Sequence, residues 1–275
     1  IVGKDKKCYF YSDTRPERYV GKLGLDSRKL LDYNDGKPVF EEDINKLRGV
    51  YLDKNYVDNV EKNKSTLKTN IRGNPLMFEF REDTDKKGVY SIDGTFDFHQ
   101  GGYGGQIESI VNNSDGSFTI RYKSDYGEEN NFERYEIIKD GPIEKDPLPN
   151  GMSYVSKYVD DKKNATYIKS AVYNWDNFTD AVISDRLLKG IWVDDDNITW
   201  VFKDINVIID GEKSRLKIGI DNGDPRDCDY LLINDTQYGF EIKDDTLTLY
   251  LIDKSKDYGT FKTNTVYKKL HRIKG

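Results

Sequence analysis

Two segments of the chain repeat one short pattern, and this repetition constrains the fold more than any other feature. Leu47-Arg48-Gly49-Val50-Tyr51 recurs 141 residues later as Leu188-Lys189-Gly190-Ile191-Trp192. Strand-like segments follow each copy, at 78–80, 116–122 and 135–139 after the first and at 200–202, 245–250 and 266–270 after the second. Their spacing differs between the halves. The pattern therefore leaves two interpretations open, a duplicated β module with unequal loops or two unrelated β-rich domains.

Length and composition indicate a folded protein with a charged surface. A chain of 275 residues corresponds to about two domains, and its 20 Tyr, 12 Phe and 3 Trp argue against disorder. The 43 basic and 49 acidic residues are mixed along the chain, with no basic stripe of the kind that neutralises phosphates. No apolar run approaches the roughly 20 residues that cross a bilayer. We therefore expect neither a nucleic-acid partner nor a transmembrane segment.

The clearest predicted boundary is the segment 141–151, which contains three of the 7 prolines and two glycines. Proline fixes φ and removes a backbone donor, so a central strand does not run through such a segment. We predict an N-terminal barrel-like domain with an irregular lead-in over 1–140, a linker over 141–151, and a C-terminal domain over 152–275 that contains a helix and a barrel.

Hydrophobic periodicity predicts helices before each repeated pattern and strands elsewhere. Apolar residues at helical spacing favour a helix over 171–188, with Gly190 as its stop, and a shorter helical turn over 41–47. Dipeptides such as Asp93-Gly94 and Asp210-Gly211 predict hairpin turns. Predicted strands lie at 7–11, 76–81, 88–92, 95–99, 106–111, 117–123 and 132–139, and at 191–194, 199–203, 206–209, 215–220, 230–233, 239–243, 246–252 and 265–272. Short strands joined this way form an antiparallel meander that closes into a barrel or curls into a sandwich.

A short helix, a Gly-x-Trp on the first strand, a meander and a basic residue after the last strand together resemble the lipocalin, or calycin, pattern. Gly190, Trp192 and Arg272 carry this resemblance in the second half. In the first half Gly49 matches and Tyr51 stands where the Trp would be, with Arg134 or Lys139 as the basic residue. The second half is short for a full lipocalin, so the smaller lipocalin-like barrels of many exported bacterial proteins are the nearer comparison.

The resemblance implies a mostly β protein with two antiparallel β-barrel domains, each preceded by a short helix. In lipocalins the Trp closes the barrel floor, the Arg packs across it, and the barrel mouth binds small apolar or amphiphilic molecules. It therefore implies structural roles for Gly49, Tyr51, Gly190, Trp192 and Arg272.

No motif in the chain specifies a reaction, a metal or a cofactor. The triplet Asp194-Asp195-Asp196 offers oxygen ligands for a cation such as calcium, but a solvated turn is the favoured interpretation, and we assign no metal. His99 and His271 stand in no motif with a nucleophile, so no catalytic residue and no cofactor is predicted. Paired carboxylates of a glycosidase cannot be chosen from sequence. Cys8 and Cys228 are isolated thiols or form one bridge between the halves.

Three tyrosines are candidate ligand contacts. The glycine-rich segment 99–106 lacks the Lys and Ser/Thr of a phosphate-binding loop, so it is a flexible loop or a lip over a pocket with Tyr103 as the contact. Tyr122 and Tyr126 are placed to stack on sugars if they lie at the surface. Alternate residues of a strand face a core at least as often.

These observations favour a non-catalytic binding protein for a small molecule, a glycan or a protein. The chain starts at Ile1 without an initiator Met, which fits removal of a signal peptide or a trimmed chain, so we expect a location outside the cytoplasm, secreted or in the cell envelope. The alternative is a protein-interaction module, such as an inhibitor or adhesin, that uses strand edges and charged loops. A carbohydrate hydrolase comes third. An apolar cavity would favour the first, a filled barrel the second, and two close carboxylates in a cleft the third.

Overall fold

The computed structural model describes residues 46–69, 76–85, 89–96, 102–112, 117–123, 133–140, 148, 151–159, 162–220, 225–255 and 259–273. The chain forms two compact units. Unit 1 consists of Ile1–Tyr51, Met77–Thr95 and Gly102–Val172, and unit 2 of Leu52–Leu76, Phe96–Gly101 and Tyr173–Gly275. No helix among the described residues is long and apolar enough to cross a membrane.

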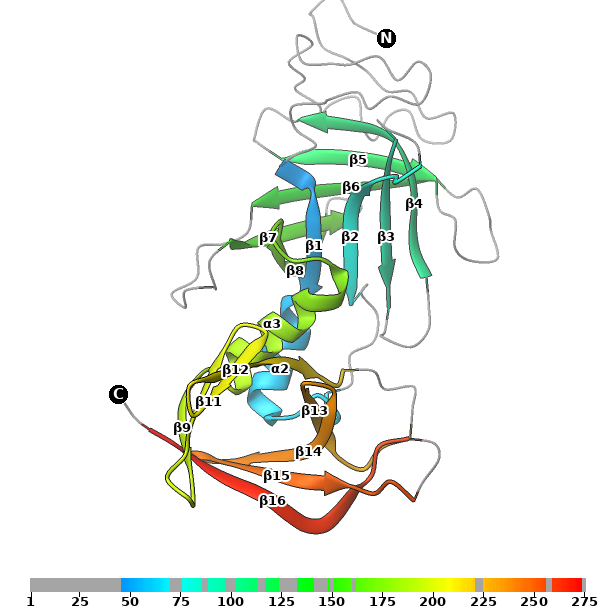
Figure 1. The fold of residues 1–275 in the computed structure, drawn as a ribbon. Coiled ribbons are helices and arrows are strands. Elements are labelled where there is room, and N and C mark those ends of the chain that lie inside the picture. Colours follow the sequence, from blue (N-terminus) through cyan, green and yellow to red (C-terminus); the bar gives the residue numbers. More distant parts are fainter. Residues whose placement is uncertain are drawn as a thin grey trace, which may run out of the picture. The chain divides into compact units, whose positions relative to one another are not determined.

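Unit 1 is an antiparallel barrel in which the strands are neighbours in chain order (Figure 1). Its eight strands are β1 (Gly49–Asp53), β2 (Met77–Glu82), β3 (Tyr90–Thr95), β4 (Gly102–Asn112), β5 (Phe118–Lys123), β6 (Glu133–Asp140), β7 (Met152–Val159) and β8 (Lys162–Ser170). Apolar residues alternate with polar ones, so that Phe80 and its partner Ile92 are both buried. Side chains from one face of each strand therefore pack into a common core.

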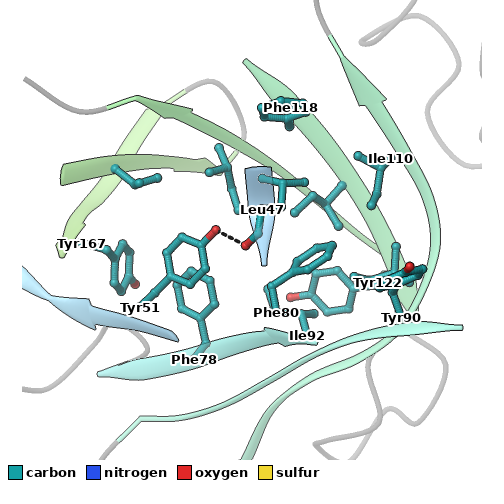
Figure 2. Close-up of a cluster of buried hydrophobic side chains, with 14 of the residues drawn as sticks. Leu47, Tyr51, Phe78, Phe80, Tyr90, Ile92, Ile110, Phe118, Tyr122 and Tyr167 are labelled. Atoms are coloured by element: carbon teal, nitrogen blue, oxygen red, sulfur yellow. Dashed lines mark hydrogen bonds between the residues drawn. The ribbon is translucent and has the colours of Figure 1, made fainter. Parts of the chain in front are cut away.

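Aromatic side chains make up much of the buried core of unit 1 (Figure 2). The Tyr51 and Phe78 rings stack with centroids 4.3 Å apart, and the Tyr167 ring meets Phe78 edge-on at 4.9 Å. The Lys157 ammonium, also buried, lies 5.5 Å from the Phe78 ring centre. The buried cluster comprises Leu47, Tyr51, Phe78, Phe80, Tyr90, Ile92, Ile107, Ile110, Phe118, Ile120, Tyr122, Ile138, Val155, Ala165 and Tyr167.

Unit 2 contains a second closed antiparallel barrel of eight strands. These are β9 (Gly190–Asp194), β10 (Thr199–Lys203), β11 (Asn206–Ile209), β12 (Glu212–Ile218), β13 (Asp229–Ile233), β14 (Thr236–Lys243), β15 (Thr246–Ile252) and β16 (Lys262–Arg272). Pairing of β16 with β9 closes the ring, with Arg272 opposite Trp192. Asn234 and Asp235 have φ of 47° and 67°, as a tight hairpin turn requires.

The two described helices, α2 (Lys54–Asn63) and α3 (Trp175–Leu187), belong to unit 2 and pack against each other. The sequence predicted α3, which begins after the N-cap Asn174. It did not predict α2. Of the helical turn expected over 41–47, Lys46 and Leu47 are helical and the remainder lies outside the described residues.

The prediction of a mostly β fold with two barrels is confirmed, but the strands are divided differently. β7 and β8 were not predicted, and Asp93-Gly94 lies inside β3 rather than at a turn. The segment 141–151 joins β6 to β7, which pair within unit 1, for example at Ile138 and Lys157. The last change of unit falls between Val172 and Tyr173. Proline and glycine mark hairpin connections as well as domain borders, which accounts for the difference from the predicted linker.

Candidate functional site

Trp192, in the first strand of the second barrel, contacts the Leu188 carbonyl oxygen and the Arg272 guanidinium. Its ring is fully buried, and its Nε1 donates a hydrogen bond of 2.7 Å to the Leu188 carbonyl oxygen. The Arg272 Cζ lies 4.4 Å from the ring centre, and Arg272 Nη2 donates to the Leu187 carbonyl oxygen at 2.9 Å. The guanidinium thus covers the indole and ties the end of α3 to the last strand.

Tyr51 has the same arrangement in the first barrel. Its hydroxyl donates a 2.5 Å hydrogen bond to the Leu47 carbonyl oxygen, again four residues earlier (Figure 2). The cation near its ring is Lys169, with Nζ 5.6 Å from the ring centre. The side chains of Arg134 and Lys139, the basic residues suggested by sequence, lie outside the described part of the chain.

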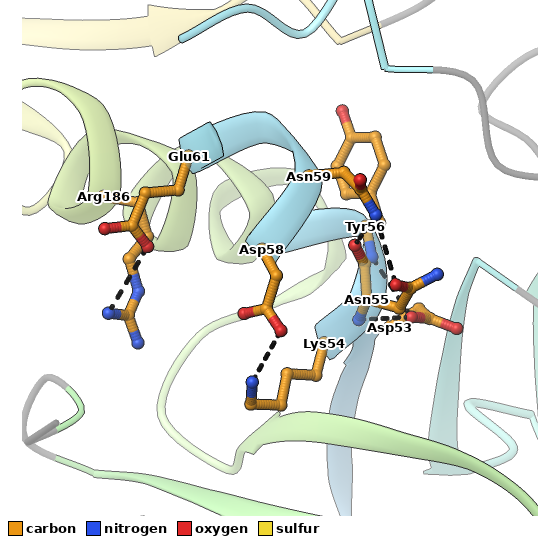
Figure 3. Close-up of polar contacts among 8 residues, drawn as sticks. All are labelled: Asp53, Lys54, Asn55, Tyr56, Asp58, Asn59, Glu61 and Arg186. Atoms are coloured by element: carbon orange, nitrogen blue, oxygen red, sulfur yellow. Dashed lines mark hydrogen bonds and ion pairs between the residues drawn. The ribbon is translucent and has the colours of Figure 1, made fainter. Parts of the chain in front are cut away.

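The repeated pattern extends two residues beyond the five seen in the sequence. Asp53 follows Tyr51 as Asp194 follows Trp192, at the same separation, and both carboxylates are buried. Asp53 Oδ1 accepts from the N–H groups of Asn55 at 2.6 Å and Tyr56 at 3.2 Å, which caps α2 (Figure 3). The sequence signal was the constant spacing of an acidic residue after each aromatic.

Asp194 closes the β9–β10 turn in the corresponding position. Its Oδ1 accepts from the N–H groups of Asp196 at 3.0 Å and Ile198 at 2.9 Å, and Lys268 Nζ lies 3.0 Å from its Oδ2. Burial by itself raises the pKa of Asp194, but the Ile198 N–H and the Lys268 ammonium together hold this pKa below its usual value.

The three aspartates 194–196 are matched by basic side chains instead of forming a cation cradle. Lys268 also pairs with Asp196, and His271 Nε2 lies 3.7 Å from Asp195 Oδ1. Among the described residues, no three His, Cys, Asp or Glu side chains are grouped to hold a metal ion.

The three tyrosines singled out as ligand contacts do not come together among the described residues. Tyr122 is fully buried in the core of unit 1, so its ring is not offered to a ligand at the surface. Tyr103 lies in β4, where its backbone is opposite Gly94, and its side chain is outside the described part. Tyr126 is also outside it. Residues 102–106 belong to a strand, where Gly104 (φ 126°) leaves no room for a side chain because a Cβ would lie 1.8 Å from the Ile92 carbonyl oxygen.

An exposed apolar patch on strands β14 to β16 was missed by sequence reasoning. The rings of Tyr238 and Tyr267 stack with centroids 4.7 Å apart, and Leu251 is the cross-strand partner of Tyr238. Leu251 and Tyr267 are 41% and 42% exposed. Burial and a hydrogen bond with Tyr267 raise the pKa of Tyr238 to about 12, so the Tyr238 hydroxyl is neutral at physiological pH. We call Tyr238, Leu251 and Tyr267 the tyrosine patch.

A charged cluster lies on the same three strands. Lys262 forms an ion pair with Glu241, whose Oε2 also accepts a 3.1 Å hydrogen bond from the Tyr250 hydroxyl. Lys262 Nζ lies 4.5 Å from the Tyr250 ring centre. The Lys262 ammonium lowers the pKa of Glu241, which keeps that carboxylate ionised. The sequence offered no signal for the patch or the cluster, because both depend on the register of β14 to β16.

Helix α2 carries polar contacts along its exposed side (Figure 3). Lys54 Nζ and Asp58 Oδ2 are 2.6 Å apart, and Glu61 Oε2 lies 3.9 Å from Arg186 Nη1 of α3. The Asn59 amide donates to the Asn55 carbonyl oxygen at 2.7 Å. These contacts support the helix and its pairing with α3.

Comparison of this chain with protein-family models, with curated proteins and with solved structures finds no match.

Proposed function

We propose that the protein is a non-catalytic binding protein that meets its partner on unit 2, at the tyrosine patch. The carrying observation is that Leu251 and Tyr267 of this patch stay exposed, whereas the large apolar side chains of both barrels are buried. In unit 1 these buried side chains form the aromatic cluster described above. In unit 2 they include Trp192, Phe202, Leu216, Leu231, Phe240 and Leu249.

A protein partner fits the patch better than a small apolar molecule does. Tyrosine is enriched at the centres of protein interfaces, where its ring adds buried area and its hydroxyl stays satisfied. Tyr238 and Tyr267 supply such rings beside Leu251, and the Glu241–Lys262 pair on the same strands supplies charge. Because each barrel closes on itself, the partner binds through side chains and loops instead of adding a strand to an edge.

The lipocalin-like relationship, a bacterial origin and a location outside the cytoplasm belong to the same proposal. A glycine and an aromatic residue on the first strand of each barrel, with a cation from its last strand, support the relationship. These are Gly190, Trp192 and Arg272 in one unit and Gly49, Tyr51 and Lys169 in the other. A secreted or envelope-bound binding protein is consistent with a charged surface and packed β cores.

The test compares binding by the chain and by Tyr267→Ser. Random peptides displayed on phage are selected on the immobilised protein, and the selected peptides are titrated against the variant and against Val172→Ser, an exposed apolar control in unit 1. We expect at least about tenfold weaker binding by Tyr267→Ser and none of this loss by the control.

Two results would count against the proposed surface. Equal peptide affinity for Tyr267→Ser and the unaltered chain would place the binding site elsewhere. Saturable one-to-one binding of a fluorescent fatty acid would show a ligand cavity and would favour a small apolar molecule as the ligand. A glycan array probed in parallel identifies a glycan partner if its signal, and not peptide binding, depends on Tyr267.

A further inference from the structure

The connection between β1 and β2 belongs to unit 2, although both strands take part in the barrel of unit 1. The chain leaves unit 1 after Tyr51 and returns to it at Met77. Residues 53–69, which we call the strap, contain α2 and the turn after it. The strap is therefore far in sequence from the barrel of unit 2 yet is built into that unit.

The turn of the strap binds one carboxylate of the barrel, that of Asp229 in β13. The backbone N–H groups of Thr66 and Leu67 donate to Asp229 Oδ1 at 2.8 Å and 2.7 Å. The Thr66 hydroxyl lies 2.8 Å from Asp229 Oδ1 and 2.8 Å from the Gly219 carbonyl oxygen, and the Ser65 hydroxyl donates to Asp229 Oδ2. The side chains of Ser65, Thr66 and Asp229 are buried. Charge-assisted hydrogen bonds of this kind are among the stronger ones in proteins.

The end of α2 positions the backbone N–H groups that bind this carboxylate. Lys64 takes the left-handed conformation (φ 53°), and the Ser65 N–H closes the helix on the Val60 carbonyl oxygen. This reversal points the next two N–H groups in one direction, toward Asp229, as in the concave anion sites that consecutive amides form. The site is thus matched to a helix end that is followed by a Ser-Thr turn.

A second contact comes from the buried face of α2. Tyr56, Val57 and Val60 are buried, α2 packs against α3, and the Glu61–Arg186 ion pair links the two helices. Burial raises the pKa of the Tyr56 hydroxyl, which stays protonated. Apolar burial and a carboxylate site thus hold the strap at two points along its length.

We infer that unit 2 carries a peptide-binding surface, made by Asp229 and α3, whose occupant is the chain's own strap. This surface holds the strap without help from the covalent link between Val172 and Tyr173. It is independent of the tyrosine patch, because none of its residues belongs to that patch. A cut at this link therefore leaves residues 1–172 and 173–275 as a non-covalent complex.

The experiment uses the full chain with a protease recognition sequence inserted between Val172 and Tyr173, where Val172 is 73% exposed. After cleavage, we expect the two pieces to elute together from a size-exclusion column at micromolar concentration. In Asp229→Asn, an amide NH2 replaces an acceptor oxygen. We expect the dissociation constant of the cut pieces to rise at least about tenfold. Asp235→Asn, an exposed turn residue of the same unit, serves as the matched control and should dissociate like the unaltered protein.

A second variant and a second measurement keep the inference testable if Asp229→Asn folds poorly. Ser65→Ala combined with Thr66→Val removes the hydroxyls from the strap itself, and hydrogen exchange of the uncut chain reports the Thr66 and Leu67 amides directly. We expect faster exchange at these amides in both variants. Separation of the cut pieces in the unaltered protein, or unchanged exchange and co-elution in the variants, would overturn the inference.

Discussion

Ionisation of Asp180 opposes folding. It lies buried in α3, and its Oδ1 accepts a 2.8 Å hydrogen bond from the Ile218 N–H. Burial raises the pKa of Asp180 from 3.8 to about 6, although the Ile218 N–H and nearby basic groups lower it in part. The folded state thus binds this proton more tightly than the unfolded state, so stability falls as the pH rises from about 4 to about 6 and then stays low.

We therefore expect Asp180→Asn to raise the free energy of unfolding by about 1 to 3 kcal/mol at pH 7, because the amide removes the buried charge and keeps an acceptor for Ile218. At pH 4 the gain should largely disappear. Urea unfolding at the two pH values measures both. An equal effect at pH 4 and pH 7 would show that the charge of Asp180 is not the cause.

Trp192 provides a residue-scale test of the barrel floor. Trp192→Ala removes the buried indole, its hydrogen bond to Leu188 and the ring against which Arg272 packs. We therefore expect the free energy of unfolding to fall by about 3 to 5 kcal/mol. Its neighbour Ile191 is 46% exposed, and Ile191→Ala should cost less than about 1 kcal/mol. Denaturant unfolding of both variants decides this. Comparable losses at the two positions would argue against Trp192 as a structural plug.

At the scale of elements, sequence patterns predicted the turns and helices whose structure depends on residues close together in the chain. The turn at Asp210 and Gly211 in the second barrel followed from its dipeptide, and α3 from its apolar spacing. Helix α2 escaped prediction because only Tyr56, Val57 and Val60 of its ten residues are buried, and its partner α3 lies more than a hundred residues away in the chain. The strap's place on Asp229 has no local signal at all. The tyrosine patch likewise depends on strand register, which sequence alone did not supply.

The glycines that start β1 and β9 occupy the same position in the repeated pattern but have different surroundings. Both have positive φ, 135° at Gly49 and 126° at Gly190, so alanine is strained at either. A Cβ at Gly49 would lie 2.2 Å from the Ser170 carbonyl oxygen, whereas a Cβ at Gly190 has no atom within 4 Å.

We expect Gly190→Ala to cost about 1 to 2 kcal/mol from backbone strain alone, and Gly49→Ala to cost clearly more because β8 must also move. Thermal unfolding, with hydrogen exchange to assign the loss to the β9 or the β1 strand, makes the comparison. An equal loss in the free energy of unfolding for both variants would mean that the β8 backbone shifts at Ser170 without loss of stability.

At the scale of the whole molecule, both units start their barrels in the same way. Each has eight antiparallel strands in chain order, an aromatic residue bonded to the carbonyl four residues earlier, a cation near that aromatic ring, and a buried aspartate two residues after it. This agreement favours a duplicated module over two unrelated domains. The strap breaks the symmetry, because only the first copy lengthens its β1–β2 connection into a helix that serves the other unit.

The strap makes the stability of unit 2 depend on residues from the first half of the chain. A chain reduced to residues 173–275 lacks the donors that Ser65, Thr66 and Leu67 give to Asp229 and the apolar face of α2. We expect unit 2 in this reduced chain to be less stable by at least about 3 kcal/mol than in the full chain. Urea unfolding followed by hydrogen exchange of the β9–β16 amides measures the difference.

A double-mutant cycle then separates the carboxylate from the rest of the strap. In the full chain, Asp229→Asn should destabilise unit 2 by about 2 to 3 kcal/mol, because two backbone donors and two hydroxyls lose an ionised acceptor. In the reduced chain the same substitution should change stability by less than about 0.5 kcal/mol, since Asp229 then faces water. Equal effects in the two chains would mean that Asp229 stabilises the barrel by itself, and the strap would then be held by the α2–α3 contact alone.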